Sequence, residues 1–387
     1  MQELMFLGLF VLALAIGWFL GRREAIKVGF MLQPHGSAVD KQYFIGLNYL
    51  LNEQPDEAIE TFIRALEVNP ETVETHIAIG KLFCQRGDVE RAIKVHQNLL
   101  ARPSLTREQA DRVQLELARD YLAVGMHQRA ERLLEELAGS GSSLRAEALV
   151  DLVAVYEHQH EWGEAIAIGE RLLRERPEFS ATLAQYHCEL AAQALQRREA
   201  ADAQQHLRAA LKVEPLCVRA LIMLAELHAQ AAEYKAAADL LQRLAQQAPD
   251  FVPEVLALAE RCADNSSLDF ADYLDQALER SAKPVVAIAL ARARLIQRTE
   301  GATSAEHFLL QRLQQQPSLS GVQELLRLRG PAEHAADPVP GLLDALSRAR
   351  PRYRCDSCGF AGNKLYWQCP SCQSWSTVKP LKGHELV

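Results

Sequence analysis

Residues 42–70, QYFIGLNYLLNEQPDEAIETFIRALEVNP, contain the pattern that predicts the fold. Two of its small residues, Gly46 and Ala58, return 34 residues later as Gly80 and Ala92. The second small position then recurs along the chain at intervals of 34 to 38 residues, at Ala58, Ala92, Ala130, Ala165, Ala203, Ala237, Ala271 and Ala305. A proline follows twelve residues after five of these alanines, at Pro70, Pro177, Pro215, Pro249 and Pro317.

A fixed period of this length is typical of a solenoid built from helix pairs. A small residue on each helix allows the two helices of a pair to approach closely, and a proline ends the second helix without lying inside it. Each pair leaves an apolar face unburied, so neighbouring pairs must stack. The pattern resembles the tetratricopeptide repeat. We therefore predict an all-α solenoid of about eight units over residues 40–318, although Arg292 stands where an apolar residue is expected.

Residues 319–350 follow the last unit and are predicted to cap the stack with helices at 320–330 and 340–350. Solenoids of this kind present a concave groove that binds segments of other proteins. Some tetratricopeptide proteins hold a C-terminal carboxylate there with Lys and Asn, and the matching positions here are Tyr43 and Leu47. This departure argues against capture of a chaperone tail. Tyr43 and Leu47 would either give the groove an apolar start or pack against the linker and neighbouring helices.

Residues 4–21, LMFLGLFVLALAIGWFLG, contain no charged side chain. At about 1.5 Å per residue such a helix is roughly 27 Å long, close to the hydrocarbon thickness of a bilayer. A cleaved signal peptide is the alternative, but the charge order is reversed, with Glu3 before the run and Arg22 and Arg23 after it. We predict an uncleaved transmembrane anchor in residues 1–21. The positive charges place the linker at residues 22–39 in the cytoplasm and the N-terminus on the opposite side of the membrane.

Four cysteines lie within 18 residues near the C-terminus, as Cys355-x-x-Cys358 and Cys369-x-x-Cys372. Two such pairs on separate turns place four thiolates tetrahedrally around one ion. Disulfides are the alternative, and a cytoplasmic location disfavours them. We predict a four-cysteine module of the zinc-ribbon or rubredoxin-like type over residues 351–387 with one bound ion, iron or zinc, since both metals accept this ligand set. Its role is structural, because thiolates fill all four positions.

The aromatic residues of this module have two possible roles. They can supply its apolar interior and dock it against the last repeats, or they can stack on nucleotides beside basic residues; they are Tyr353, Phe360, Tyr366, Trp367 and Trp375. Residues 348–387 carry seven Lys or Arg and two Asp or Glu, a net charge of +5, whereas the whole chain has a net charge of −8. An acidic chain lacks the broad basic surface of most nucleic-acid binders. We expect docking and no nucleic-acid partner.

The rest of the sequence contains no catalytic pattern. Four further cysteines are isolated along the chain and are predicted to act as small buried hydrophobes, namely Cys84, Cys188, Cys217 and Cys262. His158 and His160 fall at a predicted turn, without the spacing that places two histidines on one helical face. The sequence has no phosphate-binding loop, dinucleotide fingerprint or nucleophile elbow. We predict that the protein is not an enzyme.

The apolar anchor with Arg22 and Arg23, the repeats and the tail YRCDSCGF…LYWQCPSCQSWSTVKP together resemble the lipopolysaccharide assembly protein B family of Gram-negative bacteria. The resemblance implies a single-pass inner-membrane protein that promotes degradation of the deacetylase LpxC by the membrane protease FtsH. It also implies restraint by a lipopolysaccharide-sensing inner-membrane protein. The family's metal ligands match the four clustered cysteines, Cys355, Cys358, Cys369 and Cys372. The alternative function is a scaffold that gathers the lipopolysaccharide-synthesis enzymes at the membrane.

Overall fold

The computed structural model describes residues 45, 48, 49, 61, 72–281, 285–315, 317–329 and 351–381. Three sequence-based predictions lie outside these residues: the anchor and linker, most of the first repeat with Tyr43 and Leu47, and the helix at 340–350. Within the described part of the chain, no helix is both long and apolar enough to cross a membrane.

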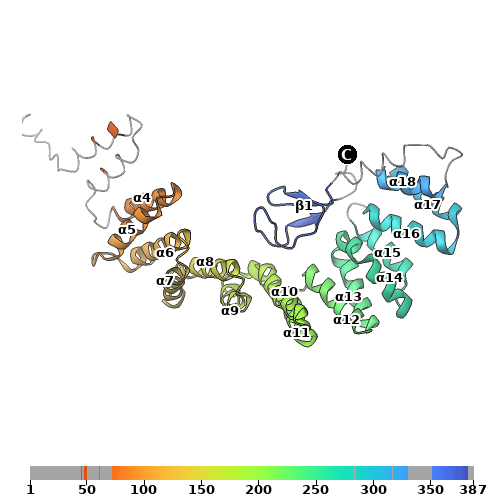
Figure 1. Cartoon of the computed structure of the whole chain (residues 1–387), viewed down its shortest axis with the longest axis horizontal. Helices are drawn as coiled ribbons and strands as arrows, with labels where there is room; N and C mark the ends of the chain where they lie inside the picture. The colour runs from red at the N-terminus through yellow and green to blue at the C-terminus, as the bar shows by residue number, and fades with distance from the viewer. Residues whose placement is uncertain are drawn as a thin grey trace, which may run out of the picture. The chain divides into compact units, whose positions relative to one another are not determined.

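Helices follow one another through the described residues until a short sheet near the C-terminus (Figure 1). The chain divides into two compact units, residues 1–148 and 149–387. The first unit contains α4 (Val73–Gln85), α5 (Val89–Leu100), α6 (Arg107–Ala123) and α7 (His127–Gly139). The second contains most of α8 (Arg145–His158), then α9 (Trp162–Leu173), η1 (Pro177–Phe179), α10 (Ser180–Gln196), α11 (Ala200–Val213), α12 (Val218–Gln230), α13 (Tyr234–Gln247), η2 (Pro249–Val255), α14 (Leu256–Asn265), α15 (Phe270–Arg280), α16 (Val286–Thr299), α17 (Ala302–Gln315) and α18 (Leu319–Leu328).

The recurring alanine lies near the start of the second helix of each pair, as the period predicts. Six of these alanines are 0% exposed, namely Ala92, Ala130, Ala165, Ala203, Ala237 and Ala305. Their burial confirms that the helices of a pair meet at this position. The predicted prolines also lie just after the second helices, at Pro177, Pro215, Pro249 and Pro317. Both features confirm the helix-pair solenoid.

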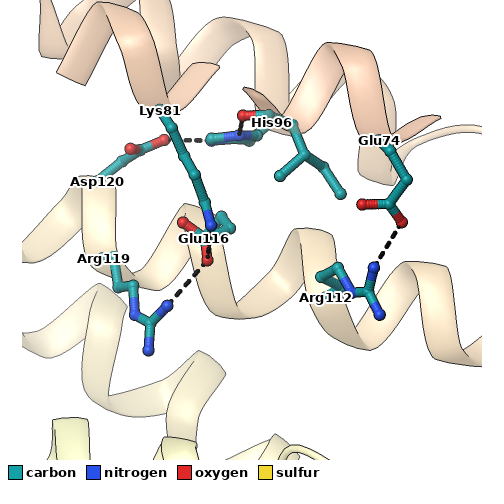
Figure 2. A network of polar contacts seen from close by, with 8 residues as sticks. Glu74, Lys81, His96, Arg112, Glu116, Arg119 and Asp120 are labelled. Carbon is teal, nitrogen blue, oxygen red and sulfur yellow. Dashed lines mark hydrogen bonds and ion pairs between the residues drawn. The ribbon is translucent and has the colours of Figure 1, made fainter. Parts of the chain in front are cut away.

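The small residue of the first helix is equally necessary, as Gly80 on α4 shows. A Cβ atom at Gly80 would lie 2.4 Å from Nε2 of His96, which is completely buried on α5. Nδ1 of His96 lies 2.5 Å from Oδ2 of Asp120 on α6. Figure 2 shows His96 at the centre of this contact between three helices. A larger residue at position 80 would therefore displace a side chain that joins two repeats.

Ion pairs surround this buried contact (Figure 2). Lys81 and Arg119 both pair with one carboxylate oxygen of Glu116, at 3.0 and 2.9 Å. Arg112 pairs with Glu74 at 2.7 Å. The Arg112–Glu74 pair is exposed on both sides, at 41 and 56%, and exposed ion pairs contribute only about 0–1 kcal/mol each. The Glu116 side chain is only 8% exposed, so its two pairs are not of this kind. Glu116 thus links Lys81 on α4 to α6 beside the close approach at Gly80.

The alanine pattern fails in the seventh unit. Ala271 is partly exposed, and Tyr273 and Leu274 are buried instead. The reason is the start of α15, where the Asp269 side chain accepts hydrogen bonds from the backbone N–H groups of Ala271 and Asp272. This N-cap fixes Phe270 as the first helical residue. The other second helices that the structure describes begin three residues before their alanine. The buried positions of α15 are therefore shifted along the sequence relative to those helices.

The last repeats accommodate their departures from the pattern. Nε of Arg292, where an apolar residue was expected, lies 2.9 and 3.1 Å from the two carboxylate oxygens of Asp275. This pairing satisfies a cation whose side chain is only 18% exposed. The helix predicted at 320–330 is present as α18.

The C-terminal module contains a three-stranded antiparallel sheet in the order β2-β1-β3. Its strands are β1 (Tyr353–Cys355), β2 (Ala361–Gly362) and β3 (Val378–Pro380). Tyr353 pairs with Gly362 on one side and with Pro380 on the other. The interior of the module is small, with Tyr353, Cys355, Cys369 and Val378 as its buried residues. So small a core needs an additional staple.

Candidate metal centre

The first pair of cysteines lies on a tight turn at the end of β1. The backbone N–H of Gly359 donates to the Cys355 carbonyl at 3.0 Å, and the N–H of Cys355 donates to the Phe360 carbonyl at 2.7 Å. Gly359 has a φ of +78°, a conformation that glycine adopts without a steric cost. The turn directs the Cys355 and Cys358 thiols toward the same point.

The second pair lies on a similar turn. The N–H of Gln373 donates to the Cys369 carbonyl at 2.8 Å, as Gly359 does for Cys355. Gln373 has a φ of +57°, so a residue with a Cβ occupies a left-handed position. For a residue other than glycine this conformation costs roughly 1–2 kcal/mol. The fold of the module therefore imposes this backbone shape without the glycine that normally favours it.

The four thiols converge as the sequence predicts. The Sγ atoms of Cys355, Cys358, Cys369 and Cys372 all lie within 4.8 Å of one another. The Cys355–Cys372 and Cys358–Cys369 sulfur pairs are each 3.7 Å apart. A tetrahedron with metal–sulfur bonds of about 2.3 Å has edges of about 3.8 Å. The arrangement thus fits one tetrahedral metal ion, and it is the only such group of potential ligands among the described residues.

Hydrogen bonds favour the thiolate form at two of these cysteines. The pKa of Cys355 is lowered by the Thr377 hydroxyl and by the backbone N–H groups of Cys358 and Ser357. The pKa of Cys372 is lowered by the side chain and backbone N–H of Ser374. Metal ligands must be deprotonated, so these contacts prepare the site for a cation.

Cys369 differs from them in its surroundings. Burial raises the pKa of its thiol, although the N–H groups of Cys372 and Ser371 oppose this effect. The charge of a bound cation would stabilise this buried thiolate. With four thiolates around it, an ion has no open position for substrate or water, so the geometry supports a structural site.

The module docks onto the helices of the second unit through Trp375. Nε1 of Trp375 donates to Oε1 of Glu157 on α8 at 2.9 Å, and Nε2 of Gln368 donates to the same oxygen at 2.6 Å. The other carboxylate oxygen accepts a hydrogen bond from the Tyr186 hydroxyl on α10. The Trp375 ring meets Trp162 and Tyr186 edge to face, at centroid distances of 6.1 and 6.0 Å. Glu157 therefore accepts donors from both the module and the helices.

A second contact lies at η2. The Trp367 ring stacks on Phe251, with centroids 6.0 Å apart. The Tyr353 hydroxyl donates to Oε1 of Glu254 at 2.7 Å, and the pKa of Tyr353 is raised by burial and by this carboxylate. Docking through aromatic residues is confirmed, and the contact at η2 lies at the start of the seventh unit, among the last repeats as predicted. The Trp375 contact lies earlier along the helices than predicted, at α8 to α10. The module contacts α8 to α10 and η2, because these elements carry the complementary acceptors and rings.

Other residues considered in the sequence form no metal group within the described part of the chain. His158 ends α8 and His160 lies in the turn before α9, where its ring contacts Trp162 at 5.3 Å. Cys188 and Cys217 are isolated from each other along the sequence, but in the structure they are neighbours whose sulfurs lie 3.9 Å apart. Sequence reasoning also missed Glu157, because an acidic residue near a helix end carries no local signal of a distant partner.

Comparisons with known proteins match both the helical repeats and the C-terminal module in sequence. Residues 353–380 match a family model described as a rubredoxin metal binding domain. Residues 45–103, 115–178 and 194–262 match tetratricopeptide repeat models. Lipopolysaccharide assembly protein B of Escherichia coli (strain K12) is 32% identical over 392 residues, which cover 99% of each chain. The chain belongs to the lipopolysaccharide assembly protein B family.

A second relative named lipopolysaccharide assembly protein B, from Haemophilus influenzae, is also 32% identical, over all of both chains. Among solved structures, the crystal structure of MamA aligns with 44% of this chain and 95% of its own, at 20% identity and a TM-score of 0.31. In this member of the lipopolysaccharide assembly protein B family, the metal module and the helices of the second unit meet at Glu157.

Proposed function

We propose that this protein acts in lipopolysaccharide assembly as a non-catalytic adaptor. The observation that carries the proposal is the full-length match at 32% identity to relatives named for that process. The helix pairs support an adaptor, because stacked repeats offer extended binding surfaces. A four-cysteine site without an open coordination position supports a structural role for the metal.

In the finer form of the proposal, the adaptor lies at the bacterial inner membrane and delivers LpxC to FtsH. Residues 4–21 would anchor it, with its body in the cytoplasm and its activity restrained by the lipopolysaccharide-sensing membrane protein. Confining two partners to one membrane raises their effective concentration toward the mM range. Weak contacts with each partner are then sufficient, and the adaptor needs no catalytic group.

The metal, iron or zinc, would be held by Cys355, Cys358, Cys369 and Cys372. When bound, it cross-links the two turns and so supplies folding free energy to a module with little core. The contacts of Trp375 with Glu157 and of Trp367 with Phe251 would then be maintained. They also leave these rings less available for stacking on bases, which favours an adaptor over a nucleic-acid binder.

Depletion of the protein from its host tests the proposal. LpxC should then persist several-fold longer, and lipopolysaccharide should accumulate. Full-length protein should restore both values, whereas protein without residues 1–21 should restore neither, even though its circular dichroism remains strongly helical. The variant Cys84→Ala, outside the metal site, serves as a matched control and should restore both.

Two results would change the conclusion. An unchanged LpxC half-life together with altered lipopolysaccharide would contradict proteolytic delivery and favour the scaffold that gathers biosynthetic enzymes. Unchanged lipopolysaccharide as well would contradict a role in its assembly.

A further inference from the structure

Two buried cysteines outside the metal site face each other. Cys188 lies within α10, and Cys217 is the N-cap residue of α12. Their Sγ atoms are 3.9 Å apart, and both residues belong to one apolar cluster, at 0 and 4% exposure. A disulfide has an S–S bond of about 2.05 Å. The two sulfurs are therefore in van der Waals contact but not bonded. Side-chain rotation and a small helix shift can close the remaining distance between them.

The two thiols differ in their surroundings. The pKa of Cys217 is lowered by its contact with Cys188 and by the backbone N–H of Ala220 in the first turn of α12. The pKa of Cys188 is raised by its contact with Cys217 and by burial. Because the N-terminus of a helix favours a thiolate, Cys217 at the start of α12 is placed to attack and Cys188 inside α10 to resolve.

Access to the pair is from the side of Cys217. Its neighbour Leu216 is 58% exposed, and residues 214–217 form the surface turn between α11 and α12. Since Cys217 itself is only 4% exposed, a small oxidant is needed to reach its sulfur. Hydrogen peroxide meets this condition, and bulky disulfides do not.

The pair is also connected to the metal module. Nε2 of Gln185 lies 3.5 Å from the Cys217 sulfur and donates to the Ser376 hydroxyl of the module at 3.0 Å. Oε1 of Gln185 is buried and has no hydrogen-bond partner in the described structure. One amide group thus serves both contacts, so movement of the Cys217 sulfur would alter the contact with Ser376.

We propose that Cys188 and Cys217 form a redox-active pair that closes to a disulfide with hydrogen peroxide, and that closure weakens docking of the metal module through Gln185. The Cys217 thiolate attacks one peroxide oxygen, the O–O bond breaks, and the hydroxide that leaves becomes water on protonation. Cys188 then loses its proton and attacks the sulfur of the Cys217 sulfenic acid, whose oxygen leaves as a second water. Two thiols are oxidised, one peroxide is reduced, and one S–S bond forms.

Peptide mapping tests the first half of the proposal. Metal-loaded protein is treated with one equivalent of hydrogen peroxide, quenched with catalase and alkylated after unfolding. We expect a peptide joined through Cys188 and Cys217 that dithiothreitol separates. The joined peptide should persist in Cys262→Ala, which removes a different buried cysteine, and be absent from Cys217→Ser. Serine is a favourable N-cap, so this variant is expected to fold. Alkylation of Cys188 and Cys217 at untreated levels would overturn the proposal.

Hydrogen exchange tests the second half. Amides of residues 374–377 should exchange several-fold faster after peroxide treatment of the unsubstituted protein and of Cys262→Ala. Oxidation of the metal site itself would increase exchange in Cys217→Ser too, so that variant isolates the contribution of the pair. A cross-link without faster exchange, or equally faster exchange in Cys217→Ser, would overturn the link between the pair and docking.

Discussion

The indole Nε1 of Trp375 donates a 2.9 Å hydrogen bond to the carboxylate of Glu157, 218 residues earlier in the chain. The same carboxylate accepts hydrogen bonds from Gln368 and Tyr186. A half-buried anion with three donors is well satisfied, whereas the donors would lose a strong partner if the charge were removed. This single side chain therefore joins the metal module to two helices.

The substitution Glu157→Gln should release the module. Glutamine keeps the size of the side chain but replaces one acceptor oxygen with an N–H₂ donor that faces other donors. We expect docking to weaken by about 1.5–3 kcal/mol. Amides of residues 353–380 should then exchange faster. Glu164→Gln, at an exposed position on α9, should leave their exchange unchanged; equal exchange in both variants would contradict the role of Glu157.

Removal of a metal ligand should unfold the module and spare the helices. We expect one equivalent of zinc plus iron in the purified protein, with a binding free energy of about 10–16 kcal/mol that also serves as folding energy. Cys358→Ser should lose the ion and the near-ultraviolet signals of the module while helical circular dichroism persists. Elemental analysis measures the metal, and less than half an equivalent in the unsubstituted protein under reducing conditions would contradict the site.

Replacing Gln373 with glycine should stabilise the second turn of the metal site. Because its φ is +57°, Gln373→Gly relieves a steric cost at a position where the backbone N–H, not the side chain, bonds to Cys369. We expect the module to gain about 1 kcal/mol and to release its metal at a higher temperature. Gly359→Ala, at a φ of +78°, should have the opposite effect. A lower release temperature for Gln373→Gly would show that its side chain stabilises the turn.

A methyl group at Gly80 should separate the first described repeats. The added Cβ would overlap the His96 ring and displace it from Asp120. We expect Gly80→Ala to destabilise the first unit by about 2–3 kcal/mol, seen as an earlier thermal transition in circular dichroism. Gly139→Ala, with nothing within 4 Å of the new Cβ at the end of α7, should be neutral or slightly stabilising. Equal transitions in the two variants would contradict the packing role of Gly80.

A buried histidine should make stability depend on pH. Burial, and secondarily the neighbouring His206, lowers the pKa of His187 to about 4, whereas an unfolded chain has a histidine pKa of about 6.5. The unfolded state therefore binds a proton first, and stability falls as pH decreases from 6.5 toward 4. Between pH 7 and pH 5 we expect a loss of about 2 kcal/mol from this group.

The variant His187→Gln cannot take up this proton. Its melting temperature should decrease less between pH 7 and pH 5 than that of the unsubstituted protein. His158→Gln, at an exposed position, should retain the full decrease. Identical decreases in all three proteins would show that His187 does not carry the effect.

The features that sequence predicted correctly are local or periodic. Spacing within each Cys-x-x-Cys pair brings two thiols onto one turn, so Cys355 and Cys358 needed no knowledge of distant residues. The alanine period likewise marks buried helix positions, because every pair repeats the same packing requirement. The exception at Ala271 also has a local cause, since Asp269 is a favoured N-cap and sets the start of α15.

The helix pairs and the ligands of the metal site could be predicted from spacing, because backbone geometry links residues a few positions or one period apart. The contacts of Cys188 with Cys217 and of Trp375 with Glu157 could be found only in the folded chain. These contacts depend on the curvature of the stacked helix pairs and on the place where the C-terminal module returns to them. Both are set by small rotations between neighbouring repeats, which accumulate along the stack. The sequence around either residue does not identify its partner, so the two cannot be paired from side-chain chemistry alone.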